Sequence, residues 1–523
     1  MDTSISPTRT VSKMRVVFEF DFRSTYQRGG SLGRGMSDIG RACFIAFMIL
    51  CVGLVAFNAA NADAKAPNVL LVLADDMGYG DLGCTGSHLL KTDRIDALAK
   101  SGVLCSRAYV ASSVCSPSRA GLITGRDPRR FGYQANLNMG SANYGTRANL
   151  LGLPPGEHTL ADHLGAAGYS TALVGKWHLG MGDGFHPQER GFDYFCGMLG
   201  GGHNYFPKPG TNKLERNGVA LSQFSSPYLT DFFTDEATGW ISKQDEVDDD
   251  KPWFMFLSYN APHGPLQATE DDLAAFSHIK DRKRRTYAAM MLALDRGVGR
   301  VLDCLDELGE RENTLICFFS DNGGATGNAS WNGELSGVKG TLREGGVRIP
   351  MIWAWPGTIP ENQTHDGVIS SLDLLPTFMA AAEKTPLPLG PPRSHEDKNN
   401  RRKAVALYGE YDGENLIPQL CGQQAAPRRT LFWRLQGQVA VLDGPDKLIS
   451  LSHRAPQVFR PTEDAGEQQD RFDSDRTRAD ELFQLMGKWQ ASLATVPLWG
   501  SSPYWSSQSA KQHDNYPPRD EPE

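Results

Sequence analysis

The stretch Asn68-Val-Leu-Leu-Val-Leu-Ala74 is an apolar run that lies between Pro67 and the acidic pair Asp75-Asp76. The run does not alternate between apolar and polar residues, as a strand with one face in water would. A short continuous run of this kind is typical of a strand that is buried on both faces, as in a parallel sheet. We therefore expect a parallel strand that ends at the two aspartates.

Further strands and helices alternate along the chain after this run. The apolar patterns predict strands at 170–174, 251–258 and 314–320, and helices at about 92–102, 159–167 and 285–308. Strands that alternate with helices indicate an α/β fold, in which helices flank a large, mainly parallel sheet.

The pattern changes after Leu375. Residues 384–403 are rich in Pro, Lys, Arg and Asn, as in a linker or a surface excursion. The rest predicts a smaller C-terminal subdomain with a short antiparallel sheet, from strands at 431–435, 439–442 and 447–451 and a closing helix at 478–493. The expected domains are 65–385 and 386–500, and the expected disordered tail is 501–523.

The first 64 residues are expected to be a leader that contains a signal peptide. Arg41 precedes an apolar run from Ala42 to Phe57, and small residues ending in Ala62-Asp63-Ala64 follow it. The run is short for a bilayer span, so we expect an exported protein without a stable membrane span in its mature form. An uncleaved membrane anchor is the alternative. Met36 is the more ordinary start for such a signal.

Charge and cysteine content exclude some classes of function. The net charge is −8 and no long basic run is present, so nucleic acid is not an expected partner. Nine cysteines occur, of which two lie in the leader. The other seven are scattered and lack C-x-x-C spacing, which argues against a dense disulfide framework and a zinc site. Most are expected to be buried thiols, although one or two disulfides are possible. Cys115 is the candidate for an unpaired thiol.

Hard oxygen donors follow two of the expected strands. Asp75 and Asp76 come after the first strand, and Asp321 and Asn322 come after the strand that ends at Ser320. Because open α/β sheets place their sites at the carboxyl edge, these side chains can converge. Oxygen donors without His or Cys fit Ca²⁺, or Mg²⁺, rather than zinc. Taken alone, an acidic pair after a strand is more often a simple turn.

The most specific segment is Cys115-Ser-Pro-Ser-Arg-Ala-Gly-Leu-Ile-Thr-Gly125. It resembles, without departure, the signature of the type I, formylglycine-dependent sulfatases, which is C-x-P-x-R followed by a short helix and Gly. The resemblance implies an alkaline-phosphatase-like sandwich. It also implies that a formylglycine-generating or anaerobic sulfatase-maturing enzyme converts Cys115 to formylglycine, with Pro117 and Arg119 as part of what it recognises. A hydrated aldehyde offers one hydroxyl that attacks sulfur and a second that later expels sulfate.

Three further segments extend the resemblance. Gly175-Lys-Trp-His-Leu-Gly180 is similar to a family segment that supplies a sulfate-binding Lys176 and a His178 that contacts the formylglycine hydroxyl. On an extended chain these two side chains point the same way. Ala261-Pro-His263 resembles the segment whose histidine protonates the leaving oxygen. Lys339 resembles the second sulfate-contacting lysine.

The resemblance implies a division of labour among these residues. Calcium, Lys176, Lys339 and Arg119 neutralise the sulfate and the formylglycine oxygens, while Asp321 helps to deprotonate the attacking hydroxyl. His263, assisted by Lys339, is the acid for the departing alcohol, and His178 takes the remaining proton. The implied calcium ligands are Asp75, Asp76, Cys115 as formylglycine, Asp321 and Asn322.

One loop departs from the family pattern, and one arginine near Lys339 needs a separate interpretation. The loop from Gly197 to Phe206 lacks the serine with which some sulfatases contact sulfate. His203 or Asn204 is expected either to replace it or to recognise the sugar, and glycines 200–202 let the backbone approach a ligand. We interpret Arg343 as structural, with Glu344 as its local partner.

The expected function is hydrolysis of a sulfated carbohydrate or an aryl sulfate, and the chain is similar to arylsulfatases and N-acetylgalactosamine-6-sulfatases. Two alternatives remain: a phosphatase or phosphonate hydrolase of the same superfold, and a non-catalytic binder of sulfated glycans. The expected location is periplasmic or extracellular, or lysosomal if the protein comes from an animal.

Overall fold

The computed structural model describes residues 65–137, 150–208, 213–247, 250–386, 411–452, 454–493, 497–499 and 516–522. The predicted leader, and most of the excursion predicted at 384–403, lie outside these ranges. No helix within the described ranges is both long and apolar enough to span a bilayer.

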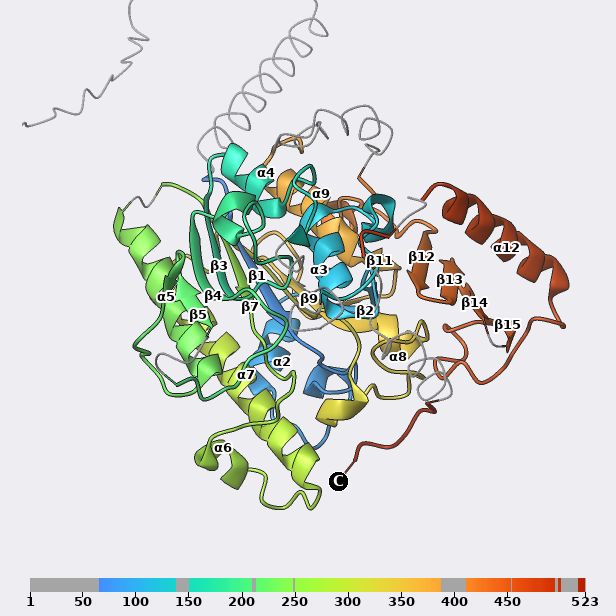
Figure 1. The fold of residues 1–523 in the computed structure, drawn as a ribbon, viewed down its shortest axis with the longest axis horizontal. Coiled ribbons are helices and arrows are strands. Elements are labelled where there is room, and N and C mark those ends of the chain that lie inside the picture. Colours follow the sequence, from blue (N-terminus) through green and yellow to red (C-terminus); the bar gives the residue numbers. More distant parts are fainter. Residues whose placement is uncertain are drawn as a thin grey trace, which may run out of the picture. The chain divides into compact units, whose positions relative to one another are not determined.

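A large mixed sheet forms the centre of the fold (Figure 1). In the described ranges it has eleven strands, ten of which follow one another across the sheet. In that order they are β10 (Gln363–His365), β2 (Val103–Tyr109), β9 (Arg348–Ala354), β8 (Thr314–Ser320), β1 (Asn68–Ala74), β7 (Trp253–Ser258), β3 (Ser170–Lys176), β4 (Tyr194–Met198), β5 (Leu214–Arg216) and β6 (Val219–Ala220). The remaining strand, β11 (Ile369–Ser370), pairs with β2.

The middle of this sheet is parallel, as the sequence predicts. β1 pairs in parallel with β7 and β8, and β3 pairs in parallel with β7 and β4. β9 runs antiparallel to both of its neighbours, and β5 and β6 form an antiparallel edge. The predicted strands at 68–74, 170–174, 251–258 and 314–320 are confirmed, while β2, β4, β5, β6, β9, β10 and β11 were not predicted.

Strand β1 explains why its sequence does not alternate. Val69, Leu71 and Leu73 belong to one hydrophobic core, and Leu70 and Val72 belong to a second core on the opposite face. All five side chains are almost fully buried. Because both faces of the strand are covered, every position favours an apolar residue.

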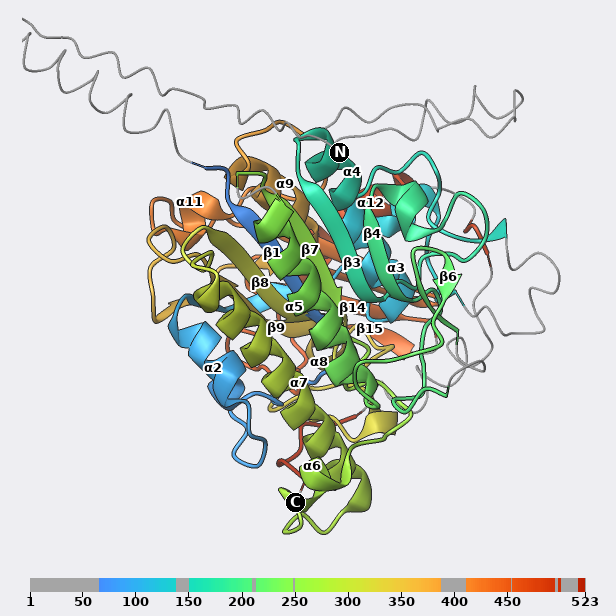
Figure 2. The ribbon, with the colours of Figure 1, turned by 90° about the vertical axis from the view of Figure 1, so that its left-hand side faces the viewer.

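Helices cover both faces of the sheet. One core contains residues of α3 (Cys115–Thr124), α4 (Leu160–Ala166) and α9 (Leu374–Ala381). The other contains residues of α2 (Asp93–Lys100), α5 (Leu229–Val247) and α7 (Arg282–Glu307), and α6 (Glu270–Ala274) packs on α7. Figure 2 shows α5 and α7 lying over the strands on their side. Two short helices, α8 (Glu344–Val347) and α11 (Ile417–Leu420), lie in connections.

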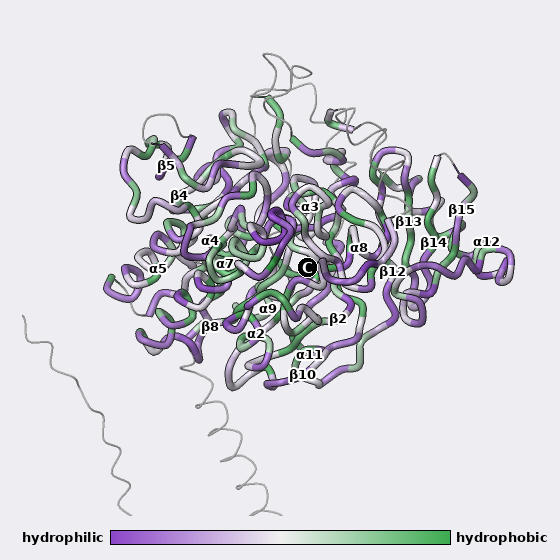
Figure 3. Tube along the Cα trace, turned by 90° about the horizontal axis from the view of Figure 1, so that it is seen from below, coloured by the Kyte–Doolittle hydropathy of each residue, from purple (hydrophilic) through white to green (hydrophobic). Residues whose placement is uncertain are grey.

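A second antiparallel sheet follows in the C-terminal part, as predicted, but it has four strands where the sequence predicted three. It consists of β12 (Thr430–Leu435), β13 (Gln438–Asp443), β14 (Asp446–Leu451) and β15 (Arg454–Phe459), and α12 (Arg476–Ala491) packs against it. Its residues Trp433 and Leu442 join a core of the large sheet, whereas Val441 and Leu448 form a small core with α12. The segment between β15 and α12 is largely hydrophilic (Figure 3).

The described end of the chain differs from the expected disordered tail. Residues 516–522 lie against the main part of the protein, where Tyr516 O accepts a hydrogen bond from Gly337 N at 2.9 Å. Sequence composition alone could not indicate this, because the segment is polar and finds its partners far away in the chain. The boundary expected at 385/386 stays a prediction, since residues 387–410 are not described.

The cysteines of the described ranges carry free thiols, and four of the seven are buried. This agrees with the expectation that most are buried thiols. The sequence allowed one or two disulfides, but none is found among these seven cysteines.

Candidate active site

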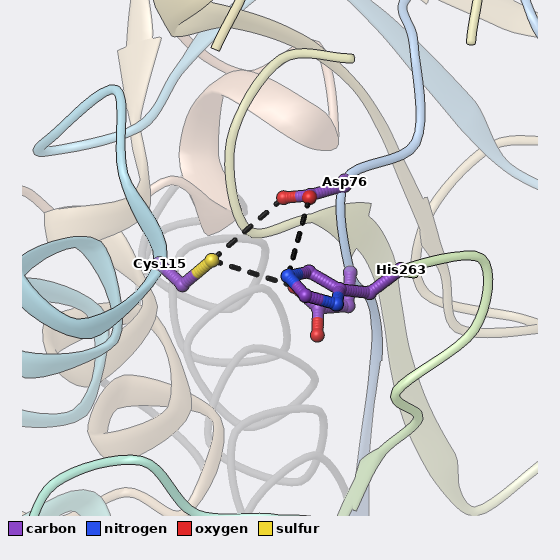
Figure 4. Close-up of side chains that lie close together, drawn as sticks. Asp76, Cys115 and His263 are labelled. Atoms are coloured by element: carbon purple, nitrogen blue, oxygen red, sulfur yellow. Dashed lines mark hydrogen bonds and ion pairs between the residues drawn. The ribbon is translucent and has the colours of Figure 1, made fainter. Parts of the chain in front are cut away.

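The carboxyl edge of the parallel strands gathers most of the predicted site residues. Asp75 and Asp76 follow β1, Asp321 follows β8, and Lys176 ends β3. Cys115 is the first residue of α3. Figure 4 shows the sulfur of Cys115 and the ring of His263 both facing the Asp76 carboxylate. Segments far apart in sequence meet here because parallel strands end on the same edge.

The thiol of Cys115 lies between carboxylates and an ammonium group. Its Sγ is 3.5 Å from Asp75 Oδ1 and 3.7 Å from Asp76 Oδ1, and Lys339 Nζ donates to it at 2.9 Å. Burial raises the pKa of the thiol, as does Asp321, whereas Lys176 and Lys339 lower it. The net shift is upward, so the unmodified side chain is a neutral thiol at neutral pH.

Each of the first two aspartates is paired with a lysine. Lys176 Nζ donates to Asp75 Oδ2 at 2.6 Å, and Lys339 Nζ donates to Asp76 Oδ1 at 2.5 Å. Burial raises the pKa of Asp75, but Lys176 and the other nearby cations outweigh it and hold that pKa well below its usual range. The pKa of Asp76 is also lowered, chiefly by Lys339 against the effect of burial. Both carboxylates are therefore ionised.

Asp76 also has an unusual backbone conformation. Its φ is 65°, in the left-handed region that non-glycine residues rarely adopt. Its amide N donates to Asp321 Oδ1 at 3.2 Å, and its Oδ1 accepts from Asn322 Nδ2 at 2.8 Å. Asn328 Nδ2 donates to its carbonyl at 3.0 Å. These bonds hold the carboxylate in place against the local strain.

Arg119 and Asp321 form a buried ion pair behind the thiol. Arg119 Nε donates to Asp321 Oδ2 at 2.9 Å, and Nη1 donates to Ser258 Oγ at 2.6 Å. Its Nη2 is buried and has no hydrogen-bond partner among the described residues. Burial raises the pKa of Asp321 to about 6, with Asp75 adding to the rise and Arg119 opposing it.

The donor set fits a hard cation. Asn322 Oδ1 is buried and accepts no hydrogen bond within the described ranges, although its Nδ2 has two acceptors. A buried amide oxygen without a donor is costly unless a cation takes that place. Ligand atoms of Asp75, Asp76, Cys115 and His263 lie within 4.8 Å of one another. Carboxylate and amide oxygens suit Ca²⁺ or Mg²⁺. Asp321 is not one of the four residues of this group.

His178 does not lie on an extended strand, so that part of the prediction is wrong. β3 ends at Lys176, and His178 has a φ of 63°, in the left-handed region rather than the extended one. The imidazole Nε2 lies 2.9 Å from the carbonyl oxygen of Leu137 and therefore carries the hydrogen. Its Nδ1 is buried and has no described partner. Burial, with Lys176, holds the pKa of His178 well below its ordinary value.

His263 faces the same carboxylates from the loop after β7. Its Nε2 is 3.5 Å from Asp76 Oδ2, and its Nδ1 is 2.7 Å from the carbonyl oxygen of Gly264. The carbonyl orients the ring with Nε2 toward the site. Burial lowers the pKa of His263, while Asp75 and Asp76 oppose that shift.

The glycine-rich loop before His203 packs against both histidines. A Cβ at Gly201 would lie 2.6 Å from His178 Nε2, so a larger residue would displace that ring. A Cβ at Gly202 would lie 3.6 Å from His263 Cε1. His203 itself is partly exposed, and its Nδ1 bonds the carbonyl of Asn204 at 2.7 Å. Among the described residues, no hydrogen bond or ion pair joins His203 to the cluster around Cys115.

Comparison with known proteins identifies the family. The sulfatase family profile matches residues 67–384, which is more than half of the chain. The chain belongs to the sulfatase family. This sulfatase is 34% identical to human arylsulfatase A over 404 residues, which cover 73% of each chain. It is 32% identical to canine N-acetylgalactosamine-6-sulfatase over 416 residues, which cover 76% of this chain and 74% of that one.

Solved structures agree with this assignment. The sulfatase superposes on the crystal structure of Ps i-CgsB in complex with k-i-k-neocarrahexaose with a TM-score of 0.73 at 33% identity, covering 86% of this chain and 98% of the other. A phosphonate monoester hydrolase of Agrobacterium radiobacter shares the fold, with a TM-score of 0.55 at 19% identity, covering 82% of this chain and 95% of the other. The alkaline-phosphatase-like architecture and the sulfatase assignment are thus confirmed.

Arg343 is structural in this sulfatase, but its partner is not Glu344. Its Nη1 donates to the carbonyl oxygen of Glu467 at 3.2 Å, and its Nη2 donates to Gln457 Oε1 at 3.2 Å. Glu344 instead accepts from Lys447 Nζ at 2.8 Å. Neighbours in sequence diverge here because Arg343 precedes α8 and Glu344 begins it.

Several site residues were missed by sequence analysis. Ser258 joins Arg119 to the carbonyl oxygen of Lys176, to which its Oγ donates at 2.7 Å. Its place at the end of a predicted strand was the available signal. Asn328 links the Asp76 carbonyl to that of Pro262. Leu137 acts through its backbone oxygen alone, for which the sequence carries no signal.

Proposed function

We propose that this sulfatase removes sulfate from a sulfated carbohydrate, with a formylglycine made from Cys115 as nucleophile and calcium as its metal ion. The single observation that carries the proposal is the position of Cys115. Its sulfur lies within 3.7 Å of both aspartates of the candidate metal site and 2.9 Å from Lys339 Nζ. A carbohydrate substrate is supported by relatives, since one is an N-acetylgalactosamine-6-sulfatase and another was solved with neocarrahexaose.

Asp75, Asp76, Asp321 and Asn322 are the protein ligands of this proposed metal site. Ca²⁺ there, or Mg²⁺, would supply positive charge against sulfate oxygens, and the formylglycine hydrate would supply the attacking hydroxyl and a second hydroxyl for release of sulfate. The free Asn322 Oδ1 and the two ionised aspartates support the ligand set.

Three side chains of the protein neutralise the anionic substrate in this proposal. Lys176 and Lys339 each pair with one aspartate, and both can turn an ammonium proton toward a sulfate oxygen. Arg119 is held on one side by Asp321, and its buried Nη2 is a donor without a described partner. Fixed cations in a buried site stabilise developing negative charge more than they do in water.

The two histidines take opposite roles in proton transfer. His178 donates Nε2–H to Leu137, so its Nδ1 has a lone pair that can accept a proton. His263 keeps its Nδ1 on a carbonyl oxygen and presents Nε2, which delivers a proton to the departing alcohol when the ring is charged. Lys339, on Asp76 beside His263, assists it. Asp321 is placed to help deprotonate the attacking group.

The proposal requires a partner and a route of export. A formylglycine-generating or anaerobic sulfatase-maturing enzyme acts on Cys115, whose recognition residues Pro117 and Arg119 are buried in α3 once the chain folds. Maturation therefore precedes folding. The predicted signal within residues 1–64 then directs the protein to the periplasm or the exterior.

Mass spectrometry of the peptide that contains Cys115 tests the proposal directly. The protein is expressed with and without a maturing enzyme, and turnover of sulfate esters and phosphate esters is compared. Formylglycine at position 115 with matching sulfatase activity is the expected result. An active protein whose Cys115 is an alkylatable thiol would overturn the nucleophile. Formylglycine with faster phosphate ester turnover would favour the phosphatase alternative, and binding without turnover by the modified protein would favour the binder.

A further inference from the structure

The described end of the chain lies against loops that are next to the candidate site in sequence. Residues 516–522, which we name the C-terminal strap, contact two loops: loop 77–90, which follows Asp75 and Asp76, and loop 328–340, which carries Lys339. Gly466 lies beside it, since a Cβ there would be 2.9 Å from Pro518 Cγ. The strap is thus enclosed by parts of the protein that are distant in sequence.

Glu521 is the most strongly held residue of the strap. Its Oε1 accepts from Ser87 Oγ at 2.6 Å and from Arg284 Nη2 at 2.7 Å, and its Oε2 accepts from His88 N at 2.9 Å. Arg284 is almost fully buried, with 1% of its side chain exposed. A buried guanidinium needs a counter-charge and hydrogen-bond acceptors for its donors, and Glu521 contributes to both.

The second carboxylate on Arg284 is Asp81, which joins the two loops. Arg284 Nη1 donates to Asp81 Oδ1 at 2.7 Å. Asp81 Oδ2 accepts from Gly78 N at 3.1 Å and from Trp331 N at 2.9 Å. The loops are so close that a Cβ at Gly78 would lie 2.2 Å from the carbonyl oxygen of Trp331. Gly78 follows Asp76 by two residues, so this network lies directly next to the carboxylates of the candidate metal site.

The other end of the strap holds the segment that carries Lys339. Tyr516 O accepts from Gly337 N at 2.9 Å, two residues before Lys339. Arg519 O accepts from Trp331 Nε1 at 2.7 Å, and Arg519 Nη2 donates to Ser330 O at 3.1 Å. The strap therefore bonds both loops along its length.

We propose that the C-terminal strap positions the Asp76 and Lys339 loops for metal and sulfate binding, and that Glu521 is a positioning residue for this site. The proposal rests on the proposed function insofar as these loops bind calcium and sulfate. Its mechanical part does not depend on the reaction, because it concerns only the order of the two loops.

Hydrogen exchange and calcium binding of the full chain test this proposal. In Glu521→Ala, the amides of Gly78, Trp331 and Gly337 should exchange faster than in the unaltered protein, while amides of β1 and β8 should not. Calcium affinity by titration calorimetry should fall about tenfold, as for loss of an outer-shell support of a metal site. Glu521→Gln keeps a side chain that can form hydrogen bonds but has no charge. Its amide exchange rates and its calcium affinity should lie between those of Glu521→Ala and those of the unaltered protein.

A matched control is Glu481→Ala on α12. Glu481 also accepts from an arginine, since Arg478 Nη1 donates to it at 2.9 Å, but it lies on an exposed helix face. This variant should bind calcium and exchange as the unaltered protein does. If Glu521→Ala does not fold, Trp331→Phe removes one donor to the strap and keeps an aromatic side chain, and it should speed exchange at Gly337.

The outcomes separate this proposal from the proposed function. Unchanged hydrogen exchange at the three amides in a folded variant would overturn the proposal that the strap orders the two loops. Faster exchange with unchanged calcium affinity would overturn its role in positioning the site. If the unaltered protein binds no calcium, the metal site fails, while the exchange data still decide whether the strap orders the loops.

Discussion

Cys115 is poorly suited to act as a thiol. Its side chain is buried beside three carboxylates, and burial together with Asp321 raises its pKa against the effect of Lys176 and Lys339. A protonated thiol is a weak nucleophile. The same surroundings suit a hydroxyl that loses a proton as it attacks, because the lysines stabilise the developing charge. The position therefore fits a modified side chain better than the encoded one.

Replacing Cys115 by alanine should abolish turnover and leave the fold intact. The smaller side chain removes the proposed nucleophile but keeps the apolar packing of α3, so kcat for nitrophenyl sulfate should fall by about ten-thousandfold or more. Circular dichroism and the melting temperature provide the control. Residual kcat within tenfold of the unaltered protein would refute the nucleophile assignment.

Replacing His263 by alanine should discriminate between substrates. A general acid contributes most when the leaving alcohol is a poor leaving group, so turnover of a sugar sulfate should fall about a hundredfold. Turnover of nitrophenyl sulfate should fall far less, because nitrophenolate leaves without a proton. His278→Ala is the control, since His278 is an exposed histidine between α6 and α7 and has no predicted role in the site. Equal losses on both substrates would remove the acid role from His263.

At the scale of elements, α4 shows how a short helix packs a titratable residue into the core. Thr159 caps α4, with its Oγ accepting from Asp162 N in a capping box. His163 follows on the buried face with no exposed surface, and its Nε2 lies 3.1 Å from Tyr411 Oη. Burial lowers the pKa of His163 to about 4, with His158 adding to that shift and Asp162 opposing it.

This shift predicts a loss of stability in mild acid. The folded state binds the His163 proton near pH 4 and the unfolded state near pH 6.5, so the unfolded state holds more protons in between. The free energy of unfolding should therefore fall as pH drops from about 6.5 to 4, by about 3 kcal/mol from this residue. Denaturant titration of His163→Gln, compared with the unaltered protein, should show a flatter pH dependence. A parallel pH dependence of both proteins would contradict it.

At the scale of the whole molecule, a buried ion cluster joins the C-terminal sheet to the large sheet. Lys447 of β14 lies 2.8 Å from Glu344 Oε1 and 3.2 Å from Glu467 Oε1, and none of the three side chains is exposed. Tyr109 Oη donates to Glu344 Oε2 at 2.8 Å from the other side. Trp433 adds a bond from its Nε1 to the Val110 carbonyl at 2.8 Å. The two sheets are therefore linked by polar contacts as well as by a shared core.

Replacing Lys447 by alanine should destabilise the protein by about 3–5 kcal/mol, because it removes the nearest cation from two buried carboxylates. Glu344 and Glu467 would keep only their longer ion pairs with Arg348 and Arg343. The surface pair Arg476–Asp480, in which both side chains are more than half exposed, provides the comparison. Arg476→Ala should cost less than about 1 kcal/mol. Denaturant titration measures both. Similar losses for the two variants would contradict the importance assigned to burial.

Removal of calcium should inactivate the protein reversibly. Dialysis against EGTA should abolish sulfatase activity and lower the melting temperature, since a ligand bound only by the folded state adds about 2.7 kcal/mol at one hundred times its Kd. Calcium added back should restore both, and magnesium tests the metal preference. Full activity after complete chelation would exclude the proposed metal site.

Sequence alone determined the elements and residues whose signals are local. Continuous apolar runs indicated β1, β7 and β8, because strands buried on both faces need apolar residues throughout. The residues that end these strands, together with the Cys115 segment, indicated most of the site. Such signals are visible in a single sequence because burial on both faces requires an apolar residue at every position of the strand.

Only the tertiary structure decided which distant groups meet. Arg343 contacts Glu467 rather than Glu344. His178 has a left-handed backbone conformation after β3, and its Nε2 bonds the carbonyl oxygen of Leu137. Glu521 bonds Arg284 and thereby contacts the loops next to the site. These contacts join residues far apart in the chain through backbone atoms and buried charges. Their energies depend on the assembled packing, so no local pattern of residue types encodes them.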